Sequence, residues 1–415
     1  MTTVDEPVPT PDVDQDELDP TTVPSELVAN SVGEYLKASF ARMRGGETGI
    51  LPVVAGLLLV SILFQAMNDH FLTAGNLVNL LVQGAVFSLL AMGEVYALLL
   101  GEIDLSIGYV AGLSAVVIAE LAKPTVGWPW WAAIAAGLVV CALIGLPSFI
   151  VTLAGLLFLQ GVMIRILGDG GTVLVQNNVI NDISSGNLSR AAGWIVMLVI
   201  VGVFGGMTWR RDARRRTAGL TAPPPALTLA KIVAVLVFGV LIVLLCNTNR
   251  GIRTPVYGVP WVVLVVLAVL VAWTYLLGRT RFGRYVYAIG GNAEAARRAG
   301  IPLARIRTIS FMLVSLTAGI AGVAYLSRGR SISTAFDGGT LVLYAVAAAV
   351  IGGTSLFGGR GKAVAGVLGG IVIAAIYNGM GLVGFDASTQ FMVTALVLLG
   401  AVTIDALSRR NRPTR

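Results

Sequence analysis

Apolar runs of about 20 residues, separated by short polar segments, follow one another along most of this chain. A helix of about 20 apolar residues is long enough to cross the hydrocarbon core of a bilayer. The sequence predicts such helices at twelve places, beginning near residues 50, 77, 105, 131, 153, 193, 229, 260, 308, 341, 363 and 390. We therefore expect an all-α fold, a polytopic membrane helix bundle of about 10–12 transmembrane helices.

Composition excludes a soluble globular protein of this size. Of the 415 residues, 56% are hydrophobic and only 12% are charged, whereas about 25% is usual in soluble domains. The 50 glycines exceed the average share of about 7%, and close packing of membrane helices through small residues accounts for such an excess. Two segments, Gly108-x-x-x-Gly112 and Gly366-x-x-x-Gly370, have the spacing that lets membrane helices approach backbone to backbone.

The distribution of charge predicts which loops face the cytoplasm. Basic residues precede the first span and place the N-terminus inside, and an even number of crossings returns the C-terminus to the same side. Three arginine-rich segments then lie in the cytoplasm: 208–228, 279–307 and 408–415. Four arginines fall on the opposite side and weaken the pattern: Arg250, Arg253, Arg328 and Arg330. Since the other arginines gather in loops beside apolar spans, the formal net charge of +7 requires no nucleic-acid partner.

The two ends of the chain differ in charge from the membrane domain. Residues 1–34 hold nine Asp or Glu and no Lys or Arg. A segment of this composition cannot bury enough apolar surface to order itself. We expect a disordered acidic cytoplasmic tail at 1–45, a transmembrane domain at 46–408 and a basic cytoplasmic tail at 409–415.

The segment 279–307 interrupts the apolar pattern with seven arginines and one acid. A short helix inside it has a defined start and stop: Asn292 is a candidate N-cap, Glu294 lies in the first turn, Arg297 in the last, and Gly300 ends it. A seven-residue helix is marginal alone in water, so we expect something outside the loop to hold it, as in a docking helix. The alternative is an arginine-rich loop that only fixes topology.

Three phrases carry a family resemblance: FGR, AIGGN, EAAR and AGI within 282–301, GEIDLSIG at 101–108, and IGGTSLFGGRG at 351–361. Over roughly residues 75–400 the chain resembles the permease subunits of sugar-importing ABC transporters of the ribose/xylose type. The first phrase resembles the cytoplasmic coupling loop of that family, which seats the ATPase, and the second resembles the family phrase G-G-I-D-L-S-x-G, with Glu102 where glycine is usual. The family's E-L-D before the third phrase is replaced by Val342, Leu343 and Tyr344.

The resemblance implies a permease fold like that of type II ABC importers, in a bacterial inner membrane. It implies two ATP-binding subunits, a second permease subunit that forms a homodimer, and an extracytoplasmic sugar-binding protein. The resemblance implies a sugar, and the length of the chain, which is closer to xylose-type than to ribose-type permeases, favours a xylose-type pentose as substrate. The residues that the resemblance assigns to ATPase coupling are Gly290, Gly291, Asn292, Glu294, Arg297 and Gly300.

Polar residues within apolar runs are candidates for the translocation pathway. Asp104 and Ser106 break a run of about thirty residues, either as a discontinuous helix that lines the pathway or as an ordinary N-cap that opens the third span. Gln160 would be costly in lipid and should face the bundle interior or its rim, and Asn378 belongs to a further phrase that resembles the family. Two rival functions remain open, a membrane scaffold without transport and a secondary transporter with an ion relay of Glu94, Asp104 and Arg165.

No catalytic chemistry is evident in the sequence. The segment Gly361-Lys362-Ala363 lacks the hydroxyl residue of a phosphate-binding loop. Cys141 and Cys246 have no CxxC spacing, and His70 is the only histidine. We therefore predict no catalytic residue, no metal site and no cofactor, and a chain whose energy comes from the ATP of a partner.

Overall fold

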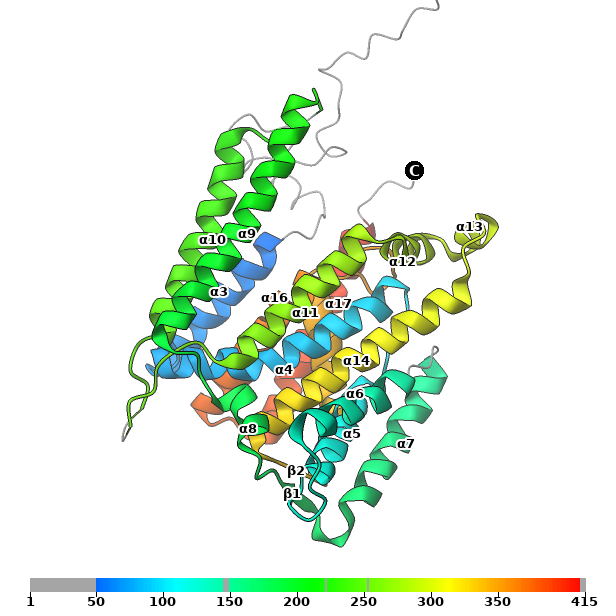
Figure 1. Cartoon of the computed structure of the whole chain (residues 1–415). Helices are drawn as coiled ribbons and strands as arrows, with labels where there is room; N and C mark the ends of the chain where they lie inside the picture. Colours follow the sequence, from blue (N-terminus) through cyan, green and yellow to red (C-terminus); the bar gives the residue numbers. More distant parts are fainter. Residues whose placement is uncertain (1–49, 145–148, 221, 252–253, 411–415) are drawn as a thin grey trace, which may run out of the picture. The chain divides into compact units, whose positions relative to one another are not determined.

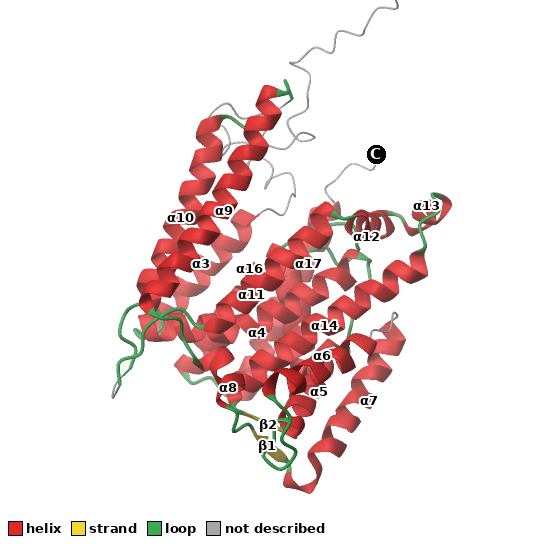
Figure 2. Cartoon of the chain, viewed as in Figure 1, coloured by secondary structure: helices red, strands yellow, loops and turns green. Residues whose placement is uncertain are grey.

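The computed structural model describes residues 50–144, 149–220, 222–251 and 254–410. The predicted acidic tail at 1–45 and residues 411–415 of the predicted basic tail lie outside this range. The described chain divides into two compact units, one formed by residues 197–239 and the other by the remainder. Helices predominate in both units, with loops and one pair of short strands between them (Figure 2).

Every span that the sequence predicts corresponds to an apolar helix. Seven helices within the described residues are long and apolar enough to cross a membrane, and five more are apolar but shorter. The prediction of an all-α polytopic bundle is therefore confirmed. The twelve helices are α3 (Ile50–Met67), α4 (Ala74–Leu99), α5 (Ile107–Leu121), α6 (Trp130–Ile144), α7 (Phe149–Leu167), α9 (Arg190–Thr217), α10 (Pro225–Cys246), α11 (Trp261–Arg279), α14 (Leu303–Gly329), α15 (Gly338–Ile351), α16 (Ala363–Val383) and α17 (Ala387–Arg410).

Short elements fill the connections between the long helices. A 3-10 turn, η2 (Gly168–Gly170), leads into β1 (Thr172–Leu174), which pairs antiparallel with β2 (Ser331–Ser333) so that Val173 lies opposite Ile332. The amphipathic helix α8 (Asn178–Ser185) packs on the end of α14, where the Ser184 hydroxyl donates to the carbonyl of Ala324 at 3.0 Å. Two more helices, α12 (Arg281–Gly291) and α13 (Ala293–Arg298), connect α11 to α14 (Figure 1).

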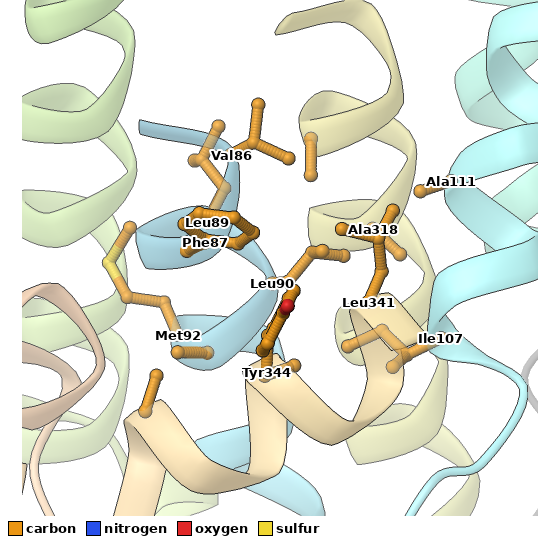
Figure 3. Close-up of a cluster of buried hydrophobic side chains, with 14 of the residues drawn as sticks. Val86, Phe87, Leu89, Leu90, Met92, Ile107, Ala111, Ala318, Leu341 and Tyr344 are labelled. Carbon is orange, nitrogen blue, oxygen red and sulfur yellow. The ribbon is translucent and has the colours of Figure 1, made fainter. Parts of the chain in front are cut away.

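The larger unit is built around α4, whose residues from Gln83 to Leu99 are all buried. Figure 3 shows Phe87, Leu90 and Met92 of this helix among side chains of α5, α14 and α15. On another face α16 lies close enough that a Cβ added to Gly366 would stand 2.6 Å from the backbone nitrogen of Met92. A Cβ added to Gly108 of α5 would stand 1.9 Å from the carbonyl oxygen of Gly338. The predicted close approach of helices through both glycine motifs is confirmed.

The smaller unit corrects one expectation about the arginine-rich segment near residue 210. The proline run and the arginines predict a solvated linker at 209–228 between two spans, but α9 continues through these arginines to Thr217 and α10 begins at Pro225. Arginine is a good helix former, and proline is favoured at the first position of a helix. The buried carboxylate of Asp212 accepts from the Thr228 hydroxyl at 3.0 Å and therefore ties the two helices together at this end.

Candidate functional site

The three phrases that carry the family resemblance meet at one place in the structure, at the C-terminal end of α4. The carbonyl oxygen of Leu99 accepts a hydrogen bond from the backbone N–H of Gly359 at 2.9 Å. Gly290 of α12 lies so close that an added Cβ would stand 1.7 Å from the same oxygen and 2.6 Å from the Gly359 nitrogen. Only a residue without a side chain fits at position 290. We call this contact of Leu99, Gly290 and Gly359 the glycine junction.

Helix α12 forms one wall of the glycine junction and is not among the elements predicted from the sequence. Its start is capped by Thr280, whose hydroxyl oxygen accepts from the N–H of Gly283 at 3.1 Å. Gly283, Val286 and Ile289 are buried at spacings of three residues, while arginines occupy other positions. Apolar or small residues at every third position, with arginines at positions between them, are the sequence signal of an amphipathic helix here.

One side-chain contact further fixes α12 against the third phrase. The hydroxyl of Tyr287 donates to the carbonyl oxygen of Gly361 at 2.7 Å. Burial raises the pKa of this phenol, so it remains a donor at neutral pH. The loop between α11 and α14 is therefore attached to the membrane bundle by both backbone and side-chain contacts.

Helix α13 has the caps that its sequence predicts. The side chain of Asn292 accepts from the N–H of Ala295 at 2.9 Å. At the other end Gly300 has a φ of +79°, its N–H bonds the Arg297 carbonyl, and the N–H of Ile301 bonds the Ala296 carbonyl at 3.1 Å. These two bonds form a Schellman motif.

The surface of α13 is polar and exposed. Glu294 pairs with Arg297 at 2.6 Å and with Arg298 at 3.2 Å, and such exposed pairs contribute at most about 1 kcal/mol each. Ala296 is the only buried residue of the helix. The helix therefore has few contacts of its own within the described chain, as expected of an element that a partner completes.

Glu102, which stands where the family has glycine, lies beside the glycine junction. Its carboxylate forms an ion pair with Arg307 of α14 at 3.0 Å, although the guanidinium N–H does not point along a hydrogen bond. Burial raises the pKa of Glu102, and the positive charge of Arg307 opposes that rise. The substitution therefore adds a charge contact between the α4–α5 connection and the first turns of α14.

Comparison with known proteins identifies the family. Residues 76–402 match the family described as "Branched-chain amino acid transport system / permease component". The chain belongs to this permease family. The permease is 34% identical over 387 residues to the xylose transport system permease protein XylH of Escherichia coli strain K12, which covers 90% of this chain and 95% of the relative.

Two further relatives support the assignment. XylH of Haemophilus influenzae is 35% identical over 374 residues, covering 86% of this chain and 96% of the relative. The ribose import permease protein RbsC of Escherichia coli strain K12 is 30% identical over 357 residues, covering 85% of this chain and 92% of the relative. No solved structure matches the permease. The resemblance to ribose/xylose-type ABC permeases is thus confirmed, and the permease is a multi-pass inner-membrane subunit of a transport system that includes an ATPase and a binding protein.

The predicted pathway residues Asp104 and Ser106 of the permease form a buried turn between α4 and α5. The carboxylate of Asp104 accepts from both the N–H and the hydroxyl of Ser106, at 2.9 and 2.6 Å. The N–H of Asp104 in turn donates to the carboxylate of Glu94 at 3.1 Å. Ser106 precedes the first residue of α5, but its hydroxyl bonds none of the first N–H groups of that helix. The polar groups of this turn therefore bond one another and Glu94 of α4.

The other predicted pathway residues lie elsewhere in the permease. Asn378 of α16 is 8% exposed and accepts from the side chain of Asn76 at 2.8 Å. Asn76 and Leu99 are 23 residues apart on α4, a separation of about 35 Å along the helix. The structure therefore does not bring Asn378 together with Asp104, and Gln160 is half-buried on α7. All four stay predictions as pathway residues.

The residues of the rival ion relay are brought together only in part. Glu94 and Asp104 are in contact and are 0% and 1% exposed. Arg165 is exposed, and within the part of the chain that the structure describes it forms no ion pair with either acid. A relay through all three residues would require a rearrangement of α7.

The stability of the fold should depend on pH through the carboxyl group of Asp104. Burial raises the pKa of Asp104 to about 6 from an ordinary 3.8, against the two hydrogen bonds from Ser106, which lower it. The neutral carboxyl therefore stabilises the fold fully below about pH 4, and this contribution is lost as the pH rises through about 6. We expect Asp104→Asn, which stays neutral, to gain thermal stability relative to the wild type by about a few degrees between pH 5 and pH 7.5.

The measurement is the unfolding midpoint of both proteins in detergent at the two pH values. Because Glu94 is in contact with residue 104, the two proteins are also compared in a Glu94→Gln background, in which residue 94 cannot respond to pH. A difference in midpoint that does not change with pH would contradict the assignment of a raised pKa to Asp104.

Proposed function

We propose that the chain is the membrane-spanning permease subunit of an ATP-driven import system for a sugar, with xylose-type pentoses as the substrate class. Its relatives are named as xylose and ribose permeases over nearly their whole length, which supports this substrate class. The transmembrane permease domain is assigned to 46–408, with 279–307 as its coupling loop. The observation that carries the mechanism is the glycine junction, because it joins this loop rigidly to the end of α4.

The partners follow from this function. Two ATP-binding subunits would dock against α13 from the cytoplasm, two copies of the permease would form one pathway, and a sugar-binding protein would deliver the solute on the opposite side. The residues that we assign to ATPase coupling lie on α13 and beside it: Gly290, Gly291, Asn292, Glu294, Arg297 and Gly300. In this arrangement the N- and C-termini are cytoplasmic, as the positive charge of the flanking loops favours. ATP hydrolysis belongs to the partner.

Coupling would work through contact rather than through chemistry in the permease. Closure of the ATPase subunits would push on α13, and α12 would pass the displacement through the glycine junction to α4. Packed interiors switch between discrete arrangements instead of deforming continuously. A push on the loop can therefore switch the pathway between inward-open and outward-open states.

Reconstitution tests the proposed function. The permease would be placed in proteoliposomes with its ATPase and its binding protein, and uptake of labelled D-xylose and D-ribose would be measured. We expect uptake only with ATP and only with the ATPase present. Uptake that an ion gradient drives without the ATPase would support the secondary transporter instead, and absence of any sugar flux would contradict the proposal.

Substitution of Gly300, which ends the Schellman motif of α13, tests the docking role of this helix. Gly300 has open space around it, so only its positive φ restricts substitution. Valine strongly disfavours this conformation, at a cost of about 1–2 kcal/mol, whereas asparagine tolerates it. We expect Gly300→Val to lower recovery of the ATPase in affinity purification by about tenfold, and the matched control Gly300→Asn to retain it. Equal recovery by the two variants would remove α13 as the docking helix.

A further inference from the structure

A cavity lies at the end of the permease bundle that is remote from α12 and α13. Its volume is about 300 Å³, at the lower end of the range for small-molecule sites. Gln83, one of its lining residues, precedes Leu99 by 16 residues on α4, a distance of about 24 Å along the helix. Arg328, another lining residue, lies at the far end of α14 from the coupling loop.

One buried polar group faces this cavity without a partner. Gln83 is 6% exposed, and its side-chain oxygen makes no hydrogen bond within the described residues. Buried acceptors in folded proteins are nearly always bonded, so an acceptor without a partner needs an explanation. A ligand hydroxyl in the cavity would supply the missing donor.

Aromatic rings form another wall of the cavity. The ring of Phe87 lies edge-on to Tyr344 and to Tyr377 with centroids 5.3 and 5.8 Å apart, and the two tyrosines lie 5.9 Å from each other. Tyr377 remains partly exposed, at 36%. Aromatic surface with a few placed polar groups is the usual lining of a small-molecule site, and it suits a solute with both C–H and O–H groups.

The charged residues of the lining favour a neutral solute. Arg328 and Asp337 contribute one charge of each sign. The Asp337 carboxylate accepts from the N–H and the hydroxyl of Thr340 at the start of α15, so part of its hydrogen-bonding capacity caps that helix, and its charge offsets that of Arg328 so that the lining has no net charge. An amino acid would need a partner for its ammonium group, whereas a polyol needs only hydrogen-bond donors and acceptors. Gln83 and Arg328 supply one acceptor and several donors.

We propose that this cavity binds a single neutral, polyhydroxylated solute of monosaccharide size, with Gln83 accepting from a ligand hydroxyl and Tyr377 packing against its C–H face. The proposal rests on the proposed function and adds the place and the residues at which the permease holds its substrate. It also gives a role to Arg328, which runs against the distribution of positive charge in the rest of the chain. None of the residues predicted from the sequence for the pathway lines this cavity.

Protection from alkylation tests binding directly. Cys141 and Cys246 are buried, so a cysteine introduced by Ala387→Cys at the cavity wall would be the reactive thiol of the described chain. We expect saturating D-xylose to slow its reaction with a membrane-impermeant maleimide by about threefold or more, and adding Gln83→Leu to abolish this protection. Gly381→Cys, exposed on α16 but outside the cavity, is the matched control and should be indifferent to sugar.

The same protection experiment with leucine in place of xylose distinguishes an amino acid from a polyol as the ligand. Protection by leucine but not by xylose would overturn the polyol assignment. No protection by xylose, in a permease that transports xylose with its ATPase and binding protein, would overturn the cavity proposal and leave the proposed function intact. Failure of the wild-type system to transport any sugar would instead count against the proposed function.

Transport kinetics give a second readout that does not depend on the introduced cysteine. We expect Gln83→Leu and Tyr377→Ala each to lower the maximal rate of sugar uptake by about tenfold, as for the loss of one ligand contact, with ATPase recovery unchanged. Tyr275→Ala, an exposed tyrosine of α11 outside the cavity, is the matched control. Wild-type rates in both cavity variants would overturn the proposal.

Discussion

Replacing Gly290 with valine should uncouple the permease from its ATPase. The new Cβ would stand 1.7 Å from the carbonyl oxygen of Leu99 and 2.6 Å from the nitrogen of Gly359, and both atoms belong to backbone that cannot rotate away. Overpacking of this kind costs about 1–3 kcal/mol or more, equivalent to about 5- to 150-fold in an equilibrium constant. We expect ATP-dependent sugar uptake to fall by a factor in this range, while the chain still inserts into the membrane.

The control for this variant is Gly278→Val. Gly278 lies in the last turn of α11, where an added Cβ meets nothing within 4 Å. Insertion and uptake should remain near wild type in this control. Normal uptake by Gly290→Val would show that displacement of α12 does not need the glycine junction, and the coupling route would have to be sought elsewhere.

The largest effect on stability should come from Gly369→Val in α16. A Cβ at this position would lie 1.7 Å from the carbonyl oxygen of Ala348, so α16 and α15 could not keep their present separation. The cost is expected at the upper end of the range for overpacking, about 3 kcal/mol or more. The unfolding midpoint in detergent should fall by about 5 °C or more.

Gly381→Val supplies the comparison within the same helix. Its Cβ would point into open space, so only the small difference in helix propensity applies. The two variants differ in position but not in chemistry, and the thermal midpoint measures both. Similar midpoints for the two would mean that α16 and α15 can separate at little cost, against the close packing seen in the structure.

Features that depend on a few neighbouring residues could be predicted from the sequence. The caps of α13 are such a case, because Asn292 and Gly300 act on backbone groups within three residues of themselves. The twelve apolar helices are another, since length and hydrophobicity are read directly from each segment. Both predictions agree with the structure.

Features that depend on distant segments could not be predicted. The need for glycine at position 290 arises only when α12 meets Leu99, nearly 200 positions earlier in the chain. The role of Glu102 likewise depends on Arg307, which no local pattern indicates. Gln83 is a polar residue in a long apolar run, the same signal that marks Gln160, but only the packed bundle shows that its oxygen faces a cavity.

Helix α14 connects the coupling loop to the cavity as one unbroken helix, so a tilt of this helix moves one relative to the other. The helix begins at Leu303, directly after the Schellman motif, and ends beside Arg328 at the cavity, without a break between. Its 27 residues give a rod of about 40 Å. If such a rod tilts by about 5° about one end, the other end moves by about 3.5 Å, slightly more than the diameter of a water molecule. A small change in the angle at which α14 leaves the loop would therefore shift the cavity wall at Arg328 by more than the width of one atom.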